Sequence, residues 1–404
     1  MKMQAWHKGL GAGLAAILML LGVSAWANAQ GLQELAEIRQ AIRQKQARWV
    51  AGDTSISVLP EHLRQYRARL SKPEVKHTDT FVSAAAPPTG LAATLDWRNN
   101  NGLSYVTPIK DQGNCGSCWA FAAAAALESY YLKQENVPGY NENFSEQVLL
   151  SCGGAGSCSG GYIDRASNFI RDIGLPPEMD YYYTQTNGRC ANAVAGWQQQ
   201  TYRIGSWSYV CGSTPNVTAI KNALAVYGPL VTTMDVYSDF FSYKSGIYSH
   251  TTGPYQGGHA VLIVGYDDVN QCFLVKNSWG TGWGEAGFFR IAFSQSNDLV
   301  EFGAYTLAYS PQGTCTYNIS PTSQAFASAG GSGSVNVGAT AACSWSAASN
   351  NNWITISQVT AGNGNGTVYY RVAANRAATT RTGSITVAGQ RLIISQAGAI
   401  IRRR

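Results

Sequence analysis

The chain has 404 residues, of which 45% are hydrophobic and 13% are charged, and this composition can fill a core and excludes a largely disordered chain. Its formal net charge is +6, but residues 313–404 contain seven Arg and no Asp, Glu, Lys or His, so the remaining residues sum to −1. The protein is therefore not basic throughout, we expect no nucleic acid among its partners, and the positive charge belongs to a C-terminal module.

Residues 1–29 have the pattern of a secretory signal peptide. Lys2 and Lys8 precede an apolar run of 14 residues, Leu10–Val23, and Ala27-Asn-Ala29 fits the small-x-small cleavage rule. The alternative, a single anchoring helix, needs about 18–20 apolar residues. We therefore expect a secreted protein, extracellular or periplasmic, with no membrane span. Nine cysteines fit an oxidising compartment, and their odd number leaves one thiol unpaired.

The segment that follows, residues 30–94, is predicted to be helical and then loose. A helix is expected over residues 33–50, a second short helix over 61–70, and a linker at 84–90, which reads Ala-Ala-Ala-Pro-Pro-Thr-Gly. The helical spacing of the first is carried by Leu35, Ile38, Ile42 and Trp49. Such a segment suits a removable pro-segment, and the alternative is a helical arm that packs on the body.

Helical patterns come first and strand patterns later in residues 95–310, which indicates an α+β fold. We expect helices at 117–134 and from Ser145 onward, and strands at 259–265 and 272–276. The first helix contains an almost unbroken apolar run and should be buried.

Cys118 is the candidate nucleophile, because it lies at the start of that apolar helix. The positive end of the helix dipole favours a thiolate, which is the reactive form of cysteine. A nearby imidazole would complete its activation. The body of the chain contains only two histidines, His250 and His259. His250 lies in a polar loop, whereas His259 follows two glycines and opens a buried strand, so we favour His259.

Three further side chains complete this candidate site. Asn277, after the next strand, could accept the ring N–H of His259, and Trp279 could shield that bond from water. The side-chain amide of Gln112 could join the backbone N–H of Cys118 in an oxyanion hole.

These residues lie in three blocks that resemble the signature blocks of the papain family of cysteine peptidases. The blocks are residues 112–121, 257–265 and 276–284. Cys118 and His259 are 141 residues apart, a separation expected for that family. The resemblance covers residues 95–310 and implies a two-lobed fold, with Cys118 on a helical lobe and His259 and Asn277 on a β-barrel-like lobe. It implies an endopeptidase that hydrolyses protein or peptide substrates through an acyl-enzyme, is made as a zymogen, and needs no metal or cofactor. We expect a monomer.

The resemblance also implies a substrate-binding cleft with an apolar S2 pocket. Its residues are Gly160, Gly161, Tyr162, Ile163, Thr233, Gly258 and Leu307. Many relatives carry Asn or Asp where Gly258 stands, so the ion-pair tuning that such a residue gives the catalytic pair is absent here. By the family pattern Cys115 pairs with Cys158, and Cys152 with Cys190. A family cysteine is replaced by Phe302, so the third disulfide must differ. Cys211 with Cys272, and Cys315 with Cys343, are guesses.

Other interpretations of the same residues remain open. Cys115-Gly-Ser-Cys118 is also the C-x-x-C motif of thiol–disulfide oxidoreductases, although it lacks their βαβ context. A zinc site would need a second closely spaced Cys or His pair. An inactive homologue that acts in binding is a third alternative. Trp279 and Trp283 would, in isolation, be interpreted as core residues.

The C-terminal segment has short alternating runs separated by Gly, Asn and Ser, which predict a small all-β, immunoglobulin-like sandwich. Blocks including Cys343-Ser-Trp345 and Arg381-Thr-Gly383 resemble BACON-type modules attached to bacterial secreted enzymes. This module, residues 313–399, could bind a glycan or surface ligand, and it argues for a bacterial source. Its aromatic residues Trp345, Trp353, Tyr369 and Tyr370 could stack on sugars or fill the core.

Overall fold

The computed structural model describes residues 30–76, 79–81, 91–311, 317–339 and 344–400. The chain divides into two compact units between residues 311 and 312. Within the described ranges, no helix is long and apolar enough to cross a membrane. The predicted signal peptide at 1–29 and the predicted linker at 84–90 lie outside the described residues.

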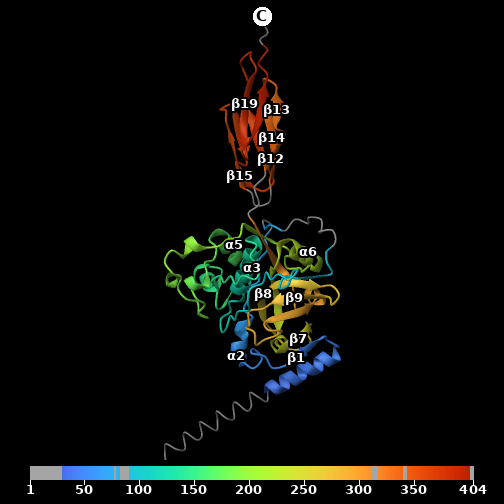
Figure 1. The fold of residues 1–404 in the computed structure, drawn as a ribbon. Coiled ribbons are helices and arrows are strands. Elements are labelled where there is room, and N and C mark those ends of the chain that lie inside the picture. Colours follow the sequence, from blue (N-terminus) through green and yellow to red (C-terminus); the bar gives the residue numbers. More distant parts are fainter. Residues whose placement is uncertain (1–29, 77–78, 82–90, 312–316, 340–343, 401–404) are drawn as a thin grey trace, which may run out of the picture. The chain divides into compact units, whose positions relative to one another are not determined.

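The first unit is a mixed α and β structure (Figure 1). Its helices are residues 30–44, α2 (Glu61–Arg64), α3 (Cys118–Gln134), α4 (Glu146–Cys152), α5 (Ile163–Asp172) and α6 (Val217–Tyr227), and short 3₁₀ turns are η1 (Gln65–Arg67), η2 (Glu178–Asp180), η3 (Cys190–Asn192), η4 (Trp197–Gln200), η5 (Ser238–Ser242) and η6 (Phe293–Asn297). Its strands are β1 (Trp49–Ala51), β2 (Thr94–Asp96), β3 (Gly156–Ser157), β4 (Gly160–Gly161), β5 (Ser206–Tyr209), β6 (Leu230–Tyr237), β7 (Tyr243–Tyr248), β8 (Tyr255–Asp267), β9 (Cys272–Lys276), β10 (Phe288–Ala292) and β11 (Ala304–Ser310).

The main sheet has the strand order β1-β7-β10-β9-β8-β6-β11-β5, with β2 also paired to β8. Both faces of β8 are buried, because Val261 and Ile263 belong to one core while Ala260 and Leu262 belong to the other. This explains why the sequence of β8 is a continuous apolar run rather than an alternating one. The second core surrounds α3, which lies beside β8 (Figure 1).

The two helices that the sequence predicted in this unit, α3 and α4, form where they were expected. α3 begins at Cys118, and its alanine-rich run is buried because neighbouring elements pack on it from several directions. α4 begins at Glu146, and the Ser145 side chain caps it by accepting the Val148 N–H at 3.1 Å. A helical lobe and a sheet lobe therefore meet along α3 and β8.

The N-terminal segment departs from the prediction in two places. The first helix ends at residue 44 rather than 50, and Trp49 lies in β1, paired with Gly246 of β7. The second helix, predicted to residue 70, ends at Arg64 and continues as 3₁₀ only to Arg67. In both places pairing with the body of the molecule overrides local helical propensity.

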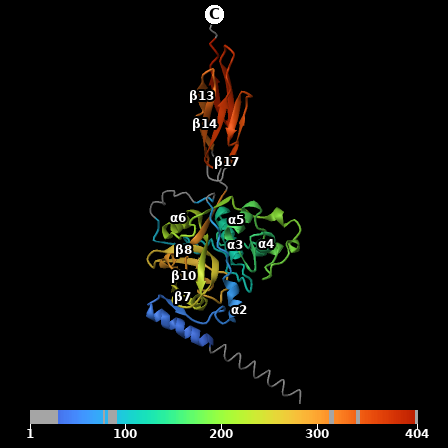
Figure 2. The same cartoon turned by 180° about the vertical axis from the view of Figure 1, so that it is seen from behind.

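The second unit is an all-β sandwich, as the alternating pattern predicted (Figure 2). One sheet consists of β12 (Tyr317–Ser320), β14 (Gly331–Ala339), β18 (Gly366–Val372) and β16 (Ile354–Gln358), and the other consists of β13 (Ser323–Phe326), β20 (Gln390–Gln396), β19 (Arg381–Val387), β15 (Ser344–Ser349) and β17 (Ala361–Asn363). Trp345 and Tyr370 are buried in its core, and Trp353 is partly buried beneath the guanidinium of Arg381, whereas Tyr369 is exposed.

Candidate active site

Cys118 is the first residue of α3, and its side chain is fully buried. The backbone N–H groups of Ala260 and Arg69 lie beside its sulfur and favour the thiolate. Ala260 follows His259 in β8, so the thiol faces the strand that carries the predicted base. Cys118 and His259, which are far apart in the sequence, thus lie near one another where the two lobes meet.

His259 is held in one orientation by its neighbours. Its Nε2–H donates to Oδ1 of Asn277 at 2.8 Å, and the ring centroid lies 4.8 Å from that of Trp279. The other ring nitrogen, Nδ1, has no hydrogen-bond partner among the described residues. That nitrogen is therefore the one left to take a proton. Trp279 is both a core residue and a cover for the histidine–asparagine bond.

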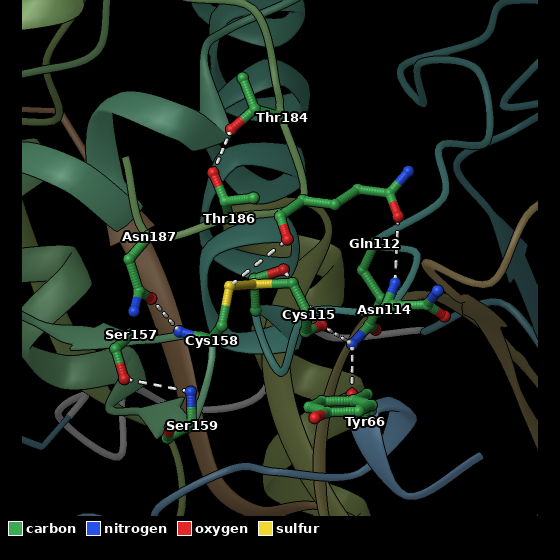
Figure 3. Close-up of a disulfide and its surroundings, with 12 residues drawn as sticks. Tyr66, Gln112, Asn114, Cys115, Ser157, Cys158, Ser159, Thr184, Thr186 and Asn187 are labelled. Atoms are coloured by element: carbon green, nitrogen blue, oxygen red, sulfur yellow. Dashed lines mark hydrogen bonds between the residues drawn. A yellow bond between two sulfur atoms is a disulfide. The ribbon is translucent and has the colours of Figure 1, made fainter. Parts of the chain in front are cut away.

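Gln112 has the orientation that an oxyanion-hole residue needs. Its Nε2 donates to the carbonyl oxygens of Cys115 at 3.0 Å and Tyr66 at 3.1 Å, while its Oε1 accepts from the Ser278 hydroxyl at 2.8 Å. Figure 3 shows the amide reaching toward Tyr66 beside the Cys115–Cys158 disulfide. Ser278 thus fixes which end of the amide faces the cleft, and sequence reasoning missed this residue although it directly follows Asn277.

A stretch of the N-terminal segment occupies the cleft. The Leu70 N–H donates to Gly258 O at 2.8 Å, and the Ser71 N–H donates to Gly161 O at 3.0 Å. Arg67 forms an ion pair with Asp111 beside them. These contacts join the segment to both lobes.

Two glycines make this close approach of main chains feasible. A Cβ on Gly160 would lie 2.4 Å from the carbonyl oxygen of Arg69, and one on Gly257 would lie 2.1 Å from that of Ala68. Both glycines also have positive φ values, 127° and 137°, which side chains disfavour. The segment from Ala68 to Ser71, which follows the 3₁₀ turn η1, therefore lies in the cleft as an extended peptide.

Burial beneath this segment shifts the pKa values of both candidate catalytic groups. It raises the pKa of the Cys118 thiol to about 11, despite the opposing backbone N–H groups. It lowers the pKa of His259 to about 4, against the effect of the Asn277 bond. With the cleft covered, the thiol and the imidazole are both neutral at pH 7, whereas the sequence suggested a thiolate.

Four of the predicted S2 residues lie at Leu70. Gly161 and Gly258 bond the segment on either side of it, and Leu70 packs against the core that contains Ile163 and Leu307. The remaining predicted members are Gly160 and Tyr162, beside Gly161, and Thr233, whose hydroxyl donates to Ala304 O at 2.8 Å. No charged side chain belongs to this set.

His250 is engaged elsewhere. Its Nδ1 lies 3.1 Å from Oδ1 of the buried Asp239, and its ring lies 4.1 Å from that of Tyr237. The same carboxylate also accepts the Tyr248 hydroxyl at 2.8 Å and the Thr251 N–H at 2.7 Å, so it closes the loop between them. His250 is thus a member of a structural cluster.

Two of the four expected disulfides are present and one prediction was wrong. Cys115 is bonded to Cys158, and Cys152 to Cys190. Cys211 and Cys272 are buried free thiols. Cys272 begins β9 and Cys211 follows β5, four strands away in the sheet, or about 19 Å, whereas a disulfide needs Cα atoms within about 7 Å. The predicted pair Cys315–Cys343 lies outside the described residues.

The alternative chemistries find no support here. Cys115 is bonded to Cys158, so it does not form a redox pair with Cys118. Among the residues that the structure describes, no three His, Cys, Asp or Glu side chains gather as a metal site would require.

Comparison with known families agrees with this geometry. The family model described as papain family cysteine protease matches residues 91–309, more than half of the chain. The chain belongs to the papain family. A second model, described as viral BACON domain, matches residues 316–398 of this papain-family chain.

Relatives of this papain-family chain include precursors and cathepsin-like enzymes. A cathepsin L-like proteinase of Fasciola hepatica is 41% identical over 212 residues, which cover 50% of this chain and 61% of the relative. A cathepsin B-like cysteine proteinase 3 of Caenorhabditis elegans is 31% identical over 63% of this chain and 77% of the relative. The chain therefore spans less than two thirds of the first of these relatives. A solved structure, recombinant stem bromelain precursor, is similar with a TM-score of 0.60 at 26% identity, over 72% of this chain and 93% of that chain.

Proposed function

We propose that this chain is the precursor of an exported cysteine endopeptidase, in which Cys118 is the nucleophile and His259 its base. The observation that carries the proposal is the peptide in the cleft, whose Tyr66 carbonyl accepts from the Gln112 amide at 3.1 Å. A peptide carbonyl at that point is where an oxyanion hole would act. The oriented His259–Asn277 pair and the thiol at the start of α3 complete the site.

The chemistry follows from these positions. Once the cleft is open, His259 Nδ1 takes the thiol proton, and the Cys118 sulfur attacks the carbonyl carbon of a bound peptide. The Gln112 amide and the Cys118 backbone N–H stabilise the oxygen that becomes negative. The imidazolium then protonates the leaving amine, the C–N bond breaks, and water hydrolyses the resulting thioester by the same route in reverse.

Residues 30–94 act in this proposal as an inhibitory pro-segment. The main chain at Leu70 and Ser71 bonds to both lobes, and Arg67, only 5% exposed, anchors the segment through Asp111. Removing them would expose the thiol and imidazole to solvent. Cleavage in or near the segment 84–94 would separate them from the enzyme.

The S2 pocket should prefer an apolar side chain, as Leu70 illustrates. The walls offer no charged group, so an ionic P2 side chain would be buried without a partner. The proposed natural substrates are proteins or peptides with an apolar residue at P2.

The C-terminal sandwich is proposed to be a recognition unit rather than part of the catalytic machinery. It contains no carboxylate, imidazole or amine side chain for proton transfer. Tyr369 is the predicted sugar-stacking residue that remains well exposed, at 46%. A glycan or other surface ligand would therefore meet the outer face of β18.

The test is peptide mapping after treatment with a thiol-reactive peptide-like inhibitor of cysteine peptidases. The processed protein should carry the label on Cys118, and Cys118→Ala should neither be labelled nor hydrolyse casein. Hydrolysis by the alanine variant at the rate of the parent protein would contradict the proposal.

A further inference from the structure

An ammonium group of the N-terminal segment occupies an acidic site on the sheet lobe. Nζ of Lys72 lies 2.9 Å from Oδ2 of Asp235 and 2.8 Å from Oε2 of Glu301. Neither carboxylate takes part in the proposed peptide hydrolysis. The ammonium group of Lys72 therefore occupies the acidic site, and Lys72 belongs to the N-terminal segment that is proposed to be removed.

The sheet lobe holds the two carboxylates in place. Asp235 lies in β6, and its N–H donates to Val300 O at 2.7 Å, while the Gly303 N–H donates to Thr233 O at 3.1 Å. These two bonds fasten the turn that carries Glu301 to β6. The acidic pair therefore does not depend on Lys72 for its position.

The acidic site lies beside the substrate-binding cleft. Asp235 pairs with Gly258 across β6 and β8, and Gly258 is the residue whose carbonyl accepts the Leu70 N–H. In an extended peptide, side chains two residues apart share one side. Lys72 therefore reaches the sheet lobe on the same side as Leu70. With Arg69 beside the thiol taken as P1, the side chain of Leu70 stands at the P2 position and that of Lys72 at the P4 position. The segment then runs in the opposite direction to a substrate, whose P2 and P4 residues precede P1.

Electrostatics favours a cation at this site. The Asp235 side chain is only 12% exposed, and its Oδ1 is buried with no hydrogen-bond partner in the described part of the chain. Burial raises the pKa of Asp235 even with Lys72 beside it. For Lys72, burial opposes the charged form, but Glu301 and Asp235 outweigh it and raise the pKa. Loss of Lys72 leaves the poorly solvated carboxylate of Asp235 beside the half-exposed one of Glu301, and a basic side chain would stabilise both.

We propose that Asp235 and Glu301 form a subsite that selects Lys or Arg at P4 of the substrate, and that Lys72 occupies it in the uncut chain. The inference rests on the proposed peptidase function and adds a second specificity element to the apolar S2 pocket. Substrates would combine an apolar P2 residue with a basic residue two positions before it.

The experiment compares fluorogenic tetrapeptides that share P1, P3 and a P2 leucine and differ at P4. Lysine is matched with uncharged norleucine, and the enzyme is the full chain after removal of its N-terminal segment, with active sites titrated by a covalent inhibitor. We expect kcat/KM to be about fivefold to tenfold higher for lysine, since one carboxylate is largely buried. Added salt should reduce this ratio.

The double variant Asp235→Asn/Glu301→Gln should bring the lysine-to-norleucine ratio close to one. Asp172→Asn, which removes an exposed carboxylate at the far end of α5, should keep the parental ratio. If the double variant folds poorly, the ratio is measured with Glu301→Gln alone, whose side chain is 49% exposed, and a partial fall is expected.

Two negative outcomes are distinguishable. Hydrolysis of all the peptides with equal kcat/KM for lysine and norleucine, or an unchanged ratio in the double variant, would overturn the subsite and leave the peptidase function intact. Failure of the processed enzyme to hydrolyse any peptide would overturn the proposed function, and the subsite with it.

Discussion

Removal of the N-terminal segment should convert Cys118 from a thiol that alkylating reagents modify very slowly into one that they modify rapidly. The perturbation is limited cleavage of the purified chain by an added protease that cuts near residues 84–94. The pKa of the buried Cys118 thiol is about 11, so about one molecule in 10⁴ carries the thiolate at pH 7. Beside an imidazolium and a helix N-terminus, exposed thiols reach pKa values of about 3.5–7.5.

The expected change can be worked out from these values. Lowering the pKa from about 11 to about 7 raises the thiolate fraction by between 10³ and 10⁴. The less basic thiolate is also less nucleophilic, by a factor of about 10² for four units. Alkylation of Cys118 by iodoacetamide at pH 7 should therefore accelerate by about 100-fold, before any contribution from easier access.

The assay is time-resolved alkylation followed by peptide mass spectrometry. Cys211 and Cys272 are internal controls, because they are buried free thiols whose pKa burial likewise raises to about 11. Their rates should not change on cleavage. In the uncut chain the Cys118 rate should rise about tenfold per pH unit, and in the cut chain it should be nearly flat above neutrality. Equal Cys118 rates before and after cleavage would refute the reasoning.

Four further outcomes are expected. Cys118→Ala and His259→Ala should each abolish peptide hydrolysis in the processed protein, whereas His250→Ala should change kcat/KM little, and a large loss there would identify a different base. Gln112→Ala should lower kcat by about 10²–10³, measured with active-site titration, and a change confined to KM would argue against an oxyanion role. In a panel that varies only P2, leucine should outperform arginine and glutamate, and best turnover of either charged residue would contradict the S2 prediction. A chain ending at Ser310 should keep its rate on small peptides, and collapse of that rate with an unchanged melting temperature would contradict a purely recognition role for the sandwich.

The sequence was informative about the site wherever a residue acts through its position in a local element. Cys118 begins a buried helix and Asn277 directly follows a strand, and both features can be read from hydrophobic patterns. The bond between Asn277 and His259 needs only that their two strands be neighbours, which they are as β8 and β9. The orienting role of Ser278 was missed because it depends on the side chain of Gln112, 166 residues earlier.

The unpredicted features depend on contacts between distant segments. The sequence predicted that the second helix continues to residue 70, but the main chain at Leu70 and Ser71 bonds to glycines of both lobes instead. The cysteine pairing failed for a similar reason, since elimination leaves Cys211 and Cys272 as partners while the strand order separates them. Strand order among distant segments is not encoded in local periodicity.

The two lobes should differ in their sensitivity to reducing agents, because disulfides join segments of one lobe and the carboxylate of Asp239 closes a loop in the other. Both described disulfides lie in the helical lobe, and within the described part of the sheet lobe the loop after β7 is closed by hydrogen bonds to Asp239 instead. Phe302, at the place of a family cysteine, is buried in that lobe's core. A reductant would therefore loosen the half of the cleft that carries Cys118 and leave the half that carries His259 intact. Loss of activity under reduction would then reflect a displaced nucleophile rather than global unfolding.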